Sequence, residues 1–205
     1  MNSFTKRGEI AGPAGLLSVA VDTTTDLPER GLAVLCHPNP QQGGTMDNKV
    51  VTTIARALTM RGWRVVRFNY RGVGGSQGAW DQGRGETDDA LAAIAAHRVA
   101  GQPLVVGGFS FGGFIAANAA MKLPEAERPR RLVLVAPSTA VNKLPAVPAD
   151  TLVIHGEADD VVPLAATMDW ARPQSLPVVV VPGAGHFFHG QLPLLKALVH
   201  RNFAD

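Results

Sequence analysis

The chain has 205 residues, of which 46% are hydrophobic and 18% charged, with a formal net charge of +2. This length fits one compact domain, and this composition excludes a disordered or fibrous chain. Because the basic residues are scattered among acidic ones, without a basic stripe that includes aromatic residues, we expect no nucleic-acid partner.

A single cysteine, Cys36, excludes an internal disulfide framework and is compatible with a reducing compartment. The first twelve residues lack the apolar core of a signal peptide. No run approaches the roughly twenty apolar residues that a membrane span needs. We therefore expect a cytoplasmic protein that does not contact a membrane.

Seven short β-branched runs predict strands, in chain order at 16–22, 31–37, 63–70, 103–109, 131–137, 151–156 and 177–183. Five longer stretches predict helices, at 48–61, 85–100, 111–122, 163–170 and 192–203. The later strands are apolar without alternation, which is typical of strands buried on both faces of a parallel sheet.

The alternation of strands and helices predicts an α/β fold, with a mostly parallel, doubly wound sheet and helices on both faces. The connection between the strands at 131–137 and 151–156 has room only for a loop. We therefore expect residues 1–205 to form a single domain.

The stretch "GFSFG" at 108–112 lies between a predicted strand and a predicted helix and matches the pattern G-x-S-x-G. A sharp turn from strand to helix strains the backbone of its central residue, and side chains two positions away on either side would collide. Glycines at 108 and 112 remove that collision, although glycines also let a helix pack closely on a sheet. The strand-turn-helix context favours Ser110 as a nucleophile.

A serine nucleophile needs a base within hydrogen-bond reach and a third group that orients the base. "HGEADDVVP" follows a predicted strand and offers Asp159 and Asp160. "GAGHFFHG" follows the next predicted strand and offers His186 and His189. The order serine, acid, histidine is the chain order of α/β-hydrolases.

Together, these three segments resemble the α/β-hydrolase superfamily. "CHPNPQQGGTMDNKVV", "FNYRGVGGSQG" and "GRGETDDALAA" further resemble its small bacterial hydrolases and carboxylesterases, some grouped with dienelactone-hydrolase-like proteins. The resemblance runs from residue 32 to residue 188. It implies the α/β-hydrolase fold without a lid domain.

The resemblance also separates the adjacent candidates. This family carries its aspartate three residues beyond the glycine of "HG", which implies Asp159 as the acid and leaves Asp160 as a cap for the next helix. The "GAGH" segment implies His186 as the base, with His189 facing solvent or bordering the pocket. We interpret His155 as a strand-end histidine whose hydrogen bonds are satisfied.

An oxyanion hole needs backbone N–H groups, one of them from the residue after the nucleophile, here Phe111. "HPNP" resembles the superfamily's "HGNP", which implies Asn39 as the second donor, and Pro40 has no N–H. The resemblance also suggests an ion pair between Arg71 and Asp88 that braces loops near the site.

Competing sites fit the sequence less well. "GVGGSQG" fails the G-x-G-x-x-G spacing, no P-loop motif occurs, and no histidine pair has metal-ligand spacing. Cys36 ends a predicted strand without a helix directly after it, so we interpret it as a small buried hydrophobic residue. We therefore expect no cofactor and no metal.

These observations predict a serine carboxylesterase (EC 3.1.1.-) that cleaves small-molecule esters through an acyl-enzyme, as a monomer or weak homodimer. Two alternatives stay open. One is a ligand-binding or sensor protein on the same fold with negligible turnover. The other is a thioesterase or lactone hydrolase that uses the same serine.

Overall fold

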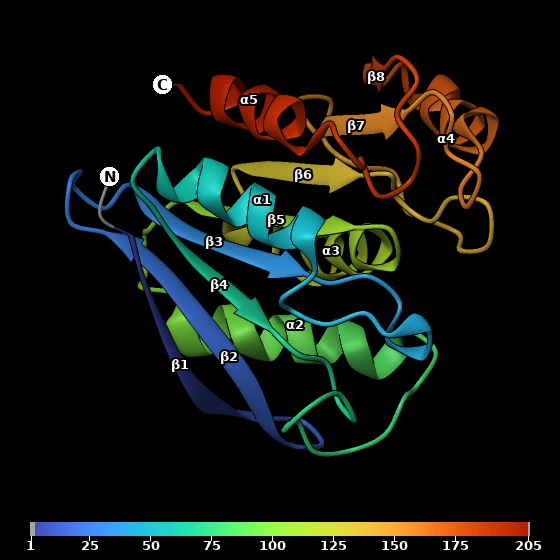
Figure 1. Cartoon of the computed structure of the whole chain (residues 1–205). Helices are drawn as coiled ribbons and strands as arrows, with labels where there is room; N and C mark the ends of the chain where they lie inside the picture. Colours follow the sequence, from blue (N-terminus) through green and yellow to red (C-terminus); the bar gives the residue numbers. More distant parts are fainter. Residues whose placement is uncertain (1–2, 205) are drawn as a thin grey trace.

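One eight-stranded sheet organises the protein, as shown by a computed structural model that describes residues 3–204 (Figure 1). The strands are β1 (Ser3–Gly12), β2 (Gly15–Thr24), β3 (Gly31–Cys36), β4 (Trp63–Phe68), β5 (Leu104–Phe109), β6 (Arg131–Val135), β7 (Leu152–Gly156) and β8 (Val178–Val181). Their order in the sheet is β1-β2-β4-β3-β5-β6-β7-β8. β2 is antiparallel to both of its neighbours, and all other pairs are parallel.

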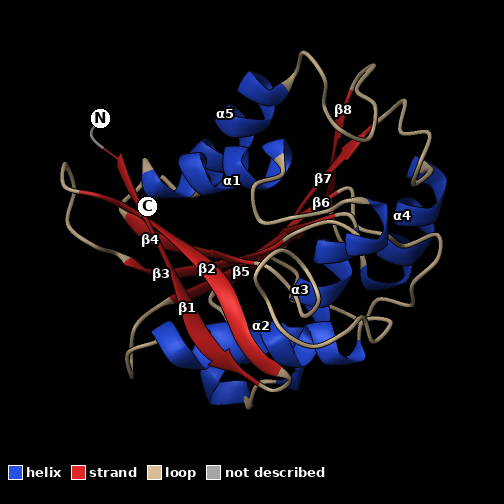
Figure 2. Cartoon of the chain, turned by 60° about the horizontal axis from the view of Figure 1, so that its bottom comes forward, coloured by secondary structure: helices blue, strands red, loops and turns tan. Residues whose placement is uncertain are grey.

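Helices cover both faces of the sheet. They are α1 (Lys49–Thr59), α2 (Arg84–His97), α3 (Phe111–Lys122), α4 (Leu164–Ala171) and α5 (Leu192–Asn202). α1 and α5 pack on one face, and α2 and α3 pack on the other (Figure 2). Each face therefore has its own hydrophobic core, and strands such as β3 and β5 are buried along their whole length.

The predicted fold class is confirmed. All seven predicted strands and all five predicted helices occur, with ends that differ by a few residues. The 16 residues of the β6–β7 connection, 136–151, contain neither a helix nor a strand.

The sequence analysis missed β1. Its centre, "TKRGE", is charged and shows no alternation of apolar and polar residues. The strand therefore has little sequence signature of its own. It forms because a tight turn pairs it along its whole length with β2, from Gly12 opposite Gly15 to Ser3 opposite Thr24.

The sheet changes its direction of growth between β3 and β5. The chain passes from β3 outward to β4, then returns to place β5 on the other side of β3. In open α/β sheets, ligands bind outside the carboxyl ends of the strands at such a switch point. The loops after β3 and β5 meet there.

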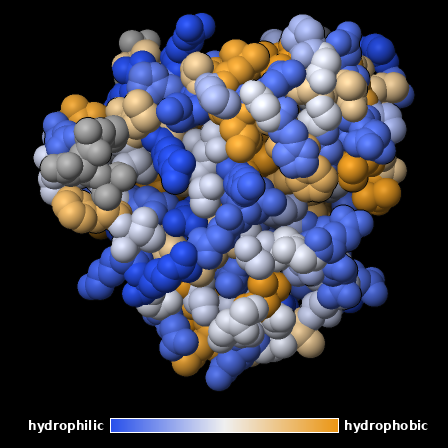
Figure 3. Space-filling model, viewed as in Figure 1, coloured by the Kyte–Doolittle hydropathy of each residue, from blue (hydrophilic) through white to orange (hydrophobic). Residues whose placement is uncertain are grey.

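The surface in Figure 3 mixes hydrophilic residues with separate hydrophobic groups, one of which lies over α5. Among residues 3–204, no helix is long and apolar enough to cross a bilayer.

Candidate active site

Ser110 occupies the sharp turn between β5 and α3, with φ 57° and ψ −120°. A Cβ on Gly108 would lie 2.1 Å from the carbonyl oxygen of Gly112, and a Cβ on Gly112 would lie 2.1 Å from that of Cys36. The Ser110 N–H donates to the carbonyl oxygen of Val135 at 2.9 Å, which helps to hold the strained backbone. The predicted collision therefore exists at both flanking positions, and only glycine fits there.

Ser110, His186 and Asp159 converge at the carboxyl ends of β5, β8 and β7. Ser110 Oγ lies 3.0 Å from His186 Nε2, and His186 Nδ1 lies 2.7 Å from Asp159 Oδ2. Because a carboxylate only accepts hydrogen bonds, Nδ1 carries the proton and Nε2 is free to take one from the serine hydroxyl. This is the geometry of a nucleophile, a base and an orienting acid.

The carboxylate of Asp159 is held from both sides. Its second oxygen, Oδ1, accepts from the N–H groups of Val161 and Val162 at 3.0 and 2.7 Å. Burial by itself raises the pKa of Asp159, but these hydrogen bonds and the one from His186 outweigh burial and lower the pKa below its ordinary value. The acid therefore stays ionised beside the imidazole.

The glycine of "HG" lets the histidine loop approach β7. A Cβ on Gly156 would lie 2.3 Å from the carbonyl oxygen of Ala184, two residues before His186. That same oxygen accepts from the N–H of Ala158 at 2.9 Å. The loops that carry the acid and the histidine are thus tied directly together.

The adjacent candidates lie outside this group. Asp160 is exposed, and the expectation that it caps α4 is wrong, because Pro163 is the N-cap and no side-chain cap is present. His189 is exposed, and its ring stacks on that of Phe187 with centroids 5.8 Å apart.

His155 is only partly satisfied. Its Nε2 lies 2.8 Å from the carbonyl oxygen of Val162, so this nitrogen donates, and it is also 3.4 Å from Asp159 Oδ2. Its Nδ1 is buried without a partner among the described residues, contrary to the expectation of a fully bonded histidine. Burial lowers the pKa of His155, which keeps the ring neutral.

The two predicted oxyanion donors both border the space next to Ser110. Phe111 is the first residue of α3, where an N–H has no partner within its helix. Within residues 3–204, neither the Phe111 N–H nor the Asn39 N–H donates to another protein group. The loop at Asn39 is closed by the Gly44 N–H, which donates to the Asn39 carbonyl oxygen at 3.0 Å.

His37 braces this loop, a role that the sequence analysis missed although "HPNP" contained the residue. Its Nδ1 donates to the carbonyl oxygen of Pro38 at 2.7 Å, and its Nε2 accepts from the N–H of Tyr70 at 3.2 Å. Burial lowers the pKa of His37 to about 4, and the hydrogen bond to the Pro38 carbonyl oxygen raises this pKa by a smaller amount. A neutral His37 thereby joins the loop after β3 to the end of β4.

Two cavities open on Ser110. One, of about 170 Å³, is bordered by His186, Phe187 and Val161. The other, of about 150 Å³, is bordered by Phe111 and by the β6–β7 loop, including Asn142. The sequence analysis missed this loop, because it contains no recognisable motif.

The predicted pair of Arg71 with Asp88 is wrong by one residue. Arg71 binds Asp89 instead, through its side chain at 2.8 to 3.2 Å and through its N–H at 2.9 Å. Asp89 is fully buried on α2, whereas Asp88 faces solvent and pairs with Lys122 at 3.0 Å. The helix turns the two neighbouring carboxylates by about 100°, so only Asp89 faces the loop.

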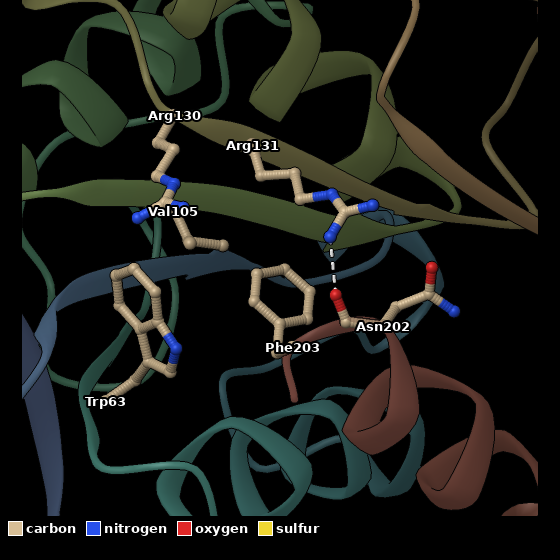
Figure 4. A pocket seen from close by; sticks show the side chains of 6 residues that line it. All are labelled: Trp63, Val105, Arg130, Arg131, Asn202 and Phe203. Atoms are coloured by element: carbon tan, nitrogen blue, oxygen red, sulfur yellow. Dashed lines mark hydrogen bonds between the residues drawn. The ribbon is translucent and has the colours of Figure 1, made fainter. Parts of the chain in front are cut away.

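A cavity at the opposite edge of the sheet lacks this chemistry. This cavity, at the amino ends of β4 and β6, is bordered by Trp63, Val105, Arg130, Arg131, Asn202 and Phe203, and Arg131 donates there to the Asn202 carbonyl oxygen (Figure 4). It contains no hydroxyl, thiol, imidazole or carboxylate side chain. Cys36 is buried, and burial raises the pKa of its thiol to about 12 despite a hydrogen bond with Tyr70. Among the described residues, no group of three or more His, Cys, Asp or Glu side chains is arranged to hold a metal ion.

Comparison with known proteins shows the family of this chain. Residues 28–150 match the serine aminopeptidase family S33, a family of hydrolases. The chain belongs to this α/β-hydrolase family. The matched region contains Ser110 and Asn39 and ends before Asp159 and His186.

Several solved structures and one further protein sequence are similar to this family member. A lidless α/β serine hydrolase from Xanthomonas campestris is 37% identical, with a TM-score of 0.89 over 98% of this chain and 94% of the other. An α/β serine hydrolase homologue from Coxiella burnetii is 38% identical, with a TM-score of 0.83 over 96% of both chains. An uncharacterized protein of Rickettsia prowazekii is 32% identical over 86% of this chain and 79% of its own length. A dienelactone hydrolase from Anabaena variabilis, 18% identical, shares the fold.

Proposed function

We propose that this family member hydrolyses small carboxylic esters with Ser110 as nucleophile, His186 as general base and acid, and Asp159 as the residue that orients the imidazole. The observation that supports this most directly is the unbroken chain of hydrogen bonds from Ser110 Oγ through His186 to Asp159.

In the proposed mechanism, Ser110 Oγ attacks the ester carbonyl carbon while His186 Nε2 takes the hydroxyl proton. The Phe111 and Asn39 N–H groups then stabilise the negative oxygen of the tetrahedral intermediate. The intermediate collapses, the carbon–oxygen bond to the alcohol breaks, and His186 gives its proton to the departing alcohol. Water attacks the acyl-enzyme by the same steps and releases the acid and free Ser110.

The cavities favour an ester over an amino-terminal peptide. A peptidase that requires a free amino terminus needs a negative group to bind the ammonium. None of the residues that border the two cavities is an aspartate or glutamate. A neutral ester fits this lining without leaving a charge unpaired.

The test is hydrolysis of short p-nitrophenyl esters by the wild type, Ser110→Ala and Cys36→Ala. Ser110→Ala should lose roughly 10⁶-fold in kcat, as other triads do. Cys36→Ala should keep its activity. A phosphonylating reagent followed by peptide mass mapping should label Ser110, and labelling of another residue, or an active Ser110→Ala variant, would overturn the proposal. One covalent event without turnover would instead favour a sensor.

A further inference from the structure

The two cavities next to Ser110 differ in the residues that border them. Both are bordered by Ser110, Asn39, Gln42 and Val161, so a substrate bonded to the serine can occupy both. Only the larger one is bordered by His186, and only the smaller one is bordered by Phe111. We define them as the histidine cavity and the loop cavity.

Proton transfer determines which half of an ester each cavity takes. The alcohol oxygen must receive its proton from His186 Nε2 as the carbon–oxygen bond breaks, so this oxygen lies on the His186 side of the serine. The acyl chain stays bonded to the same carbonyl carbon and points in a different direction. Resting on the proposed function, we propose that the histidine cavity binds the alcohol and the loop cavity binds a short acyl group with a hydrogen-bonding substituent.

The size of the loop cavity limits the acyl group. Its volume of about 150 Å³ is below the roughly 300–1,000 Å³ of pockets that enclose drug-sized ligands, so it favours a small acyl group. Val141, at the rim of the loop cavity, is 84% exposed, so a longer chain would extend past it into solvent.

The polar groups of the loop cavity define its chemistry. Asn142 Nδ2 donates to Ser138 Oγ at 2.9 Å, and the Ser138 N–H donates to the Ser110 carbonyl oxygen at 3.2 Å. This leaves the Ser138 hydroxyl proton and Asn142 Oδ1 without partners among residues 3–204. One is a donor and the other an acceptor, so a hydroxyl group on the acyl chain can bond to both.

The rim of the histidine cavity carries exposed apolar side chains, although Gln42 and Asn48 also border it. The Phe187 ring stands beside His186, with ring centroids 5.1 Å apart, and is 45% exposed. Val161, which is 47% exposed, forms a part of the rim that the two cavities share. An aromatic or other apolar alcohol would cover these side chains on binding, which favours such alcohols over methanol.

The test uses two substrate series that each vary one half of the ester. The acyl series compares phenyl lactate with phenyl propionate and phenyl 3-hydroxybutyrate with phenyl butyrate. The alcohol series compares phenyl acetate with methyl acetate. The variants are Asn142→Leu and Phe187→Ala, with Val99→Ala, at a 61% exposed residue outside both cavities, as the control.

Asn142→Leu should reduce the preference in kcat/KM for at least one hydroxyacyl ester by about two- to tenfold, the usual effect of one hydrogen bond. It should leave the preference for phenyl over methyl acetate unchanged. Phe187→Ala should reduce that second preference by up to about tenfold and leave the acyl preference unchanged. Val99→Ala should change neither ratio.

A second variant keeps the test independent of the hydrogen bond. Val141→Phe should narrow the loop cavity and slow phenyl hexanoate more than phenyl acetate. The inference is overturned if the wild type shows no preference for either hydroxyacyl ester. It is also overturned if Asn142→Leu changes the preference for phenyl over methyl acetate, or if Phe187→Ala changes the preference for hydroxyacyl esters. A wild type that hydrolyses none of these esters would instead refute the proposed function itself.

Discussion

Gly112 in the first turn of α3 lies against the carbonyl oxygen of Cys36 in β3, so close that a Cβ would approach this oxygen to 2.1 Å. The oxygen cannot move away easily, because it belongs to the backbone of a buried central strand. Gly112→Ala should therefore push α3 away from the sheet and move Ser110 with it. We expect a loss of about 1–3 kcal/mol in the free energy of unfolding and a large loss of the proposed hydrolytic activity.

Urea denaturation and the p-nitrophenyl ester assay measure both effects. Gly8→Ala is the matched control, because Gly8 is exposed on β1 and its added Cβ would meet nothing within 4 Å. Wild-type stability and activity in Gly112→Ala would show that this contact does not position Ser110.

The acid of the site can be identified by comparing two neighbouring aspartates. Asp159→Asn keeps an oxygen that can accept from the Val161 and Val162 N–H groups, but its amide cannot hold His186 in the required tautomer. We expect kcat to fall by about 10⁴, as in other triads with this substitution. Asp160→Asn changes an exposed side chain and should have little effect. A greater loss from Asp160→Asn than from Asp159→Asn would reverse the assignment.

The sequence predicts the convergence of these residues because each candidate lies in a short loop after an apolar strand, although β8, before His186, is only partly buried. Parallel strands end at the same edge of a sheet, so Ser110, Asp159 and His186 meet although 76 residues separate the first from the last. The strands and helices were predictable for a similar reason, because buried parallel strands leave long apolar runs. β1 was not predictable, because it depends on its partner strand rather than on its own pattern.

Other features depend on distances that a sequence pattern does not contain. The choice of Asp89 over Asp88 as the partner of Arg71 depends on the direction in which α2 presents each side chain. The loop cavity depends on how a loop without a motif folds over Ser110.

The two acids on α2 allow a direct comparison of a buried and an exposed ion pair. Asp89→Ala leaves the largely buried Arg71 guanidinium without its carboxylate, which should cost about 3–5 kcal/mol of unfolding free energy. Asp88→Ala breaks an exposed pair with Lys122, for which we expect about 0–1 kcal/mol. Thermal or urea denaturation of the two variants measures the difference. Equal losses would mean that Arg71 finds another partner.

The buried His37 makes stability depend on pH. Its pKa is about 4 in the folded protein, compared with 6.5 for an ordinary histidine. Between these values the unfolded chain binds a proton that the folded protein does not, so stability rises with pH in this window. The contribution of His37 is complete above pH 6.5 and is lost as the pH falls to 4, with a total of about 3 kcal/mol.

His37→Gln removes this titration while keeping a polar side chain. The free energy of unfolding, measured in urea at pH 7.5 and at pH 4.5, should fall less for His37→Gln than for the wild type. His155 contributes in the same direction, because its pKa is also lowered, so part of the pH dependence should remain in the variant. His189→Gln, at an exposed position, should retain the wild-type dependence. If His37→Gln retained it too, His37 would not be the buried neutral group that links this stability to pH.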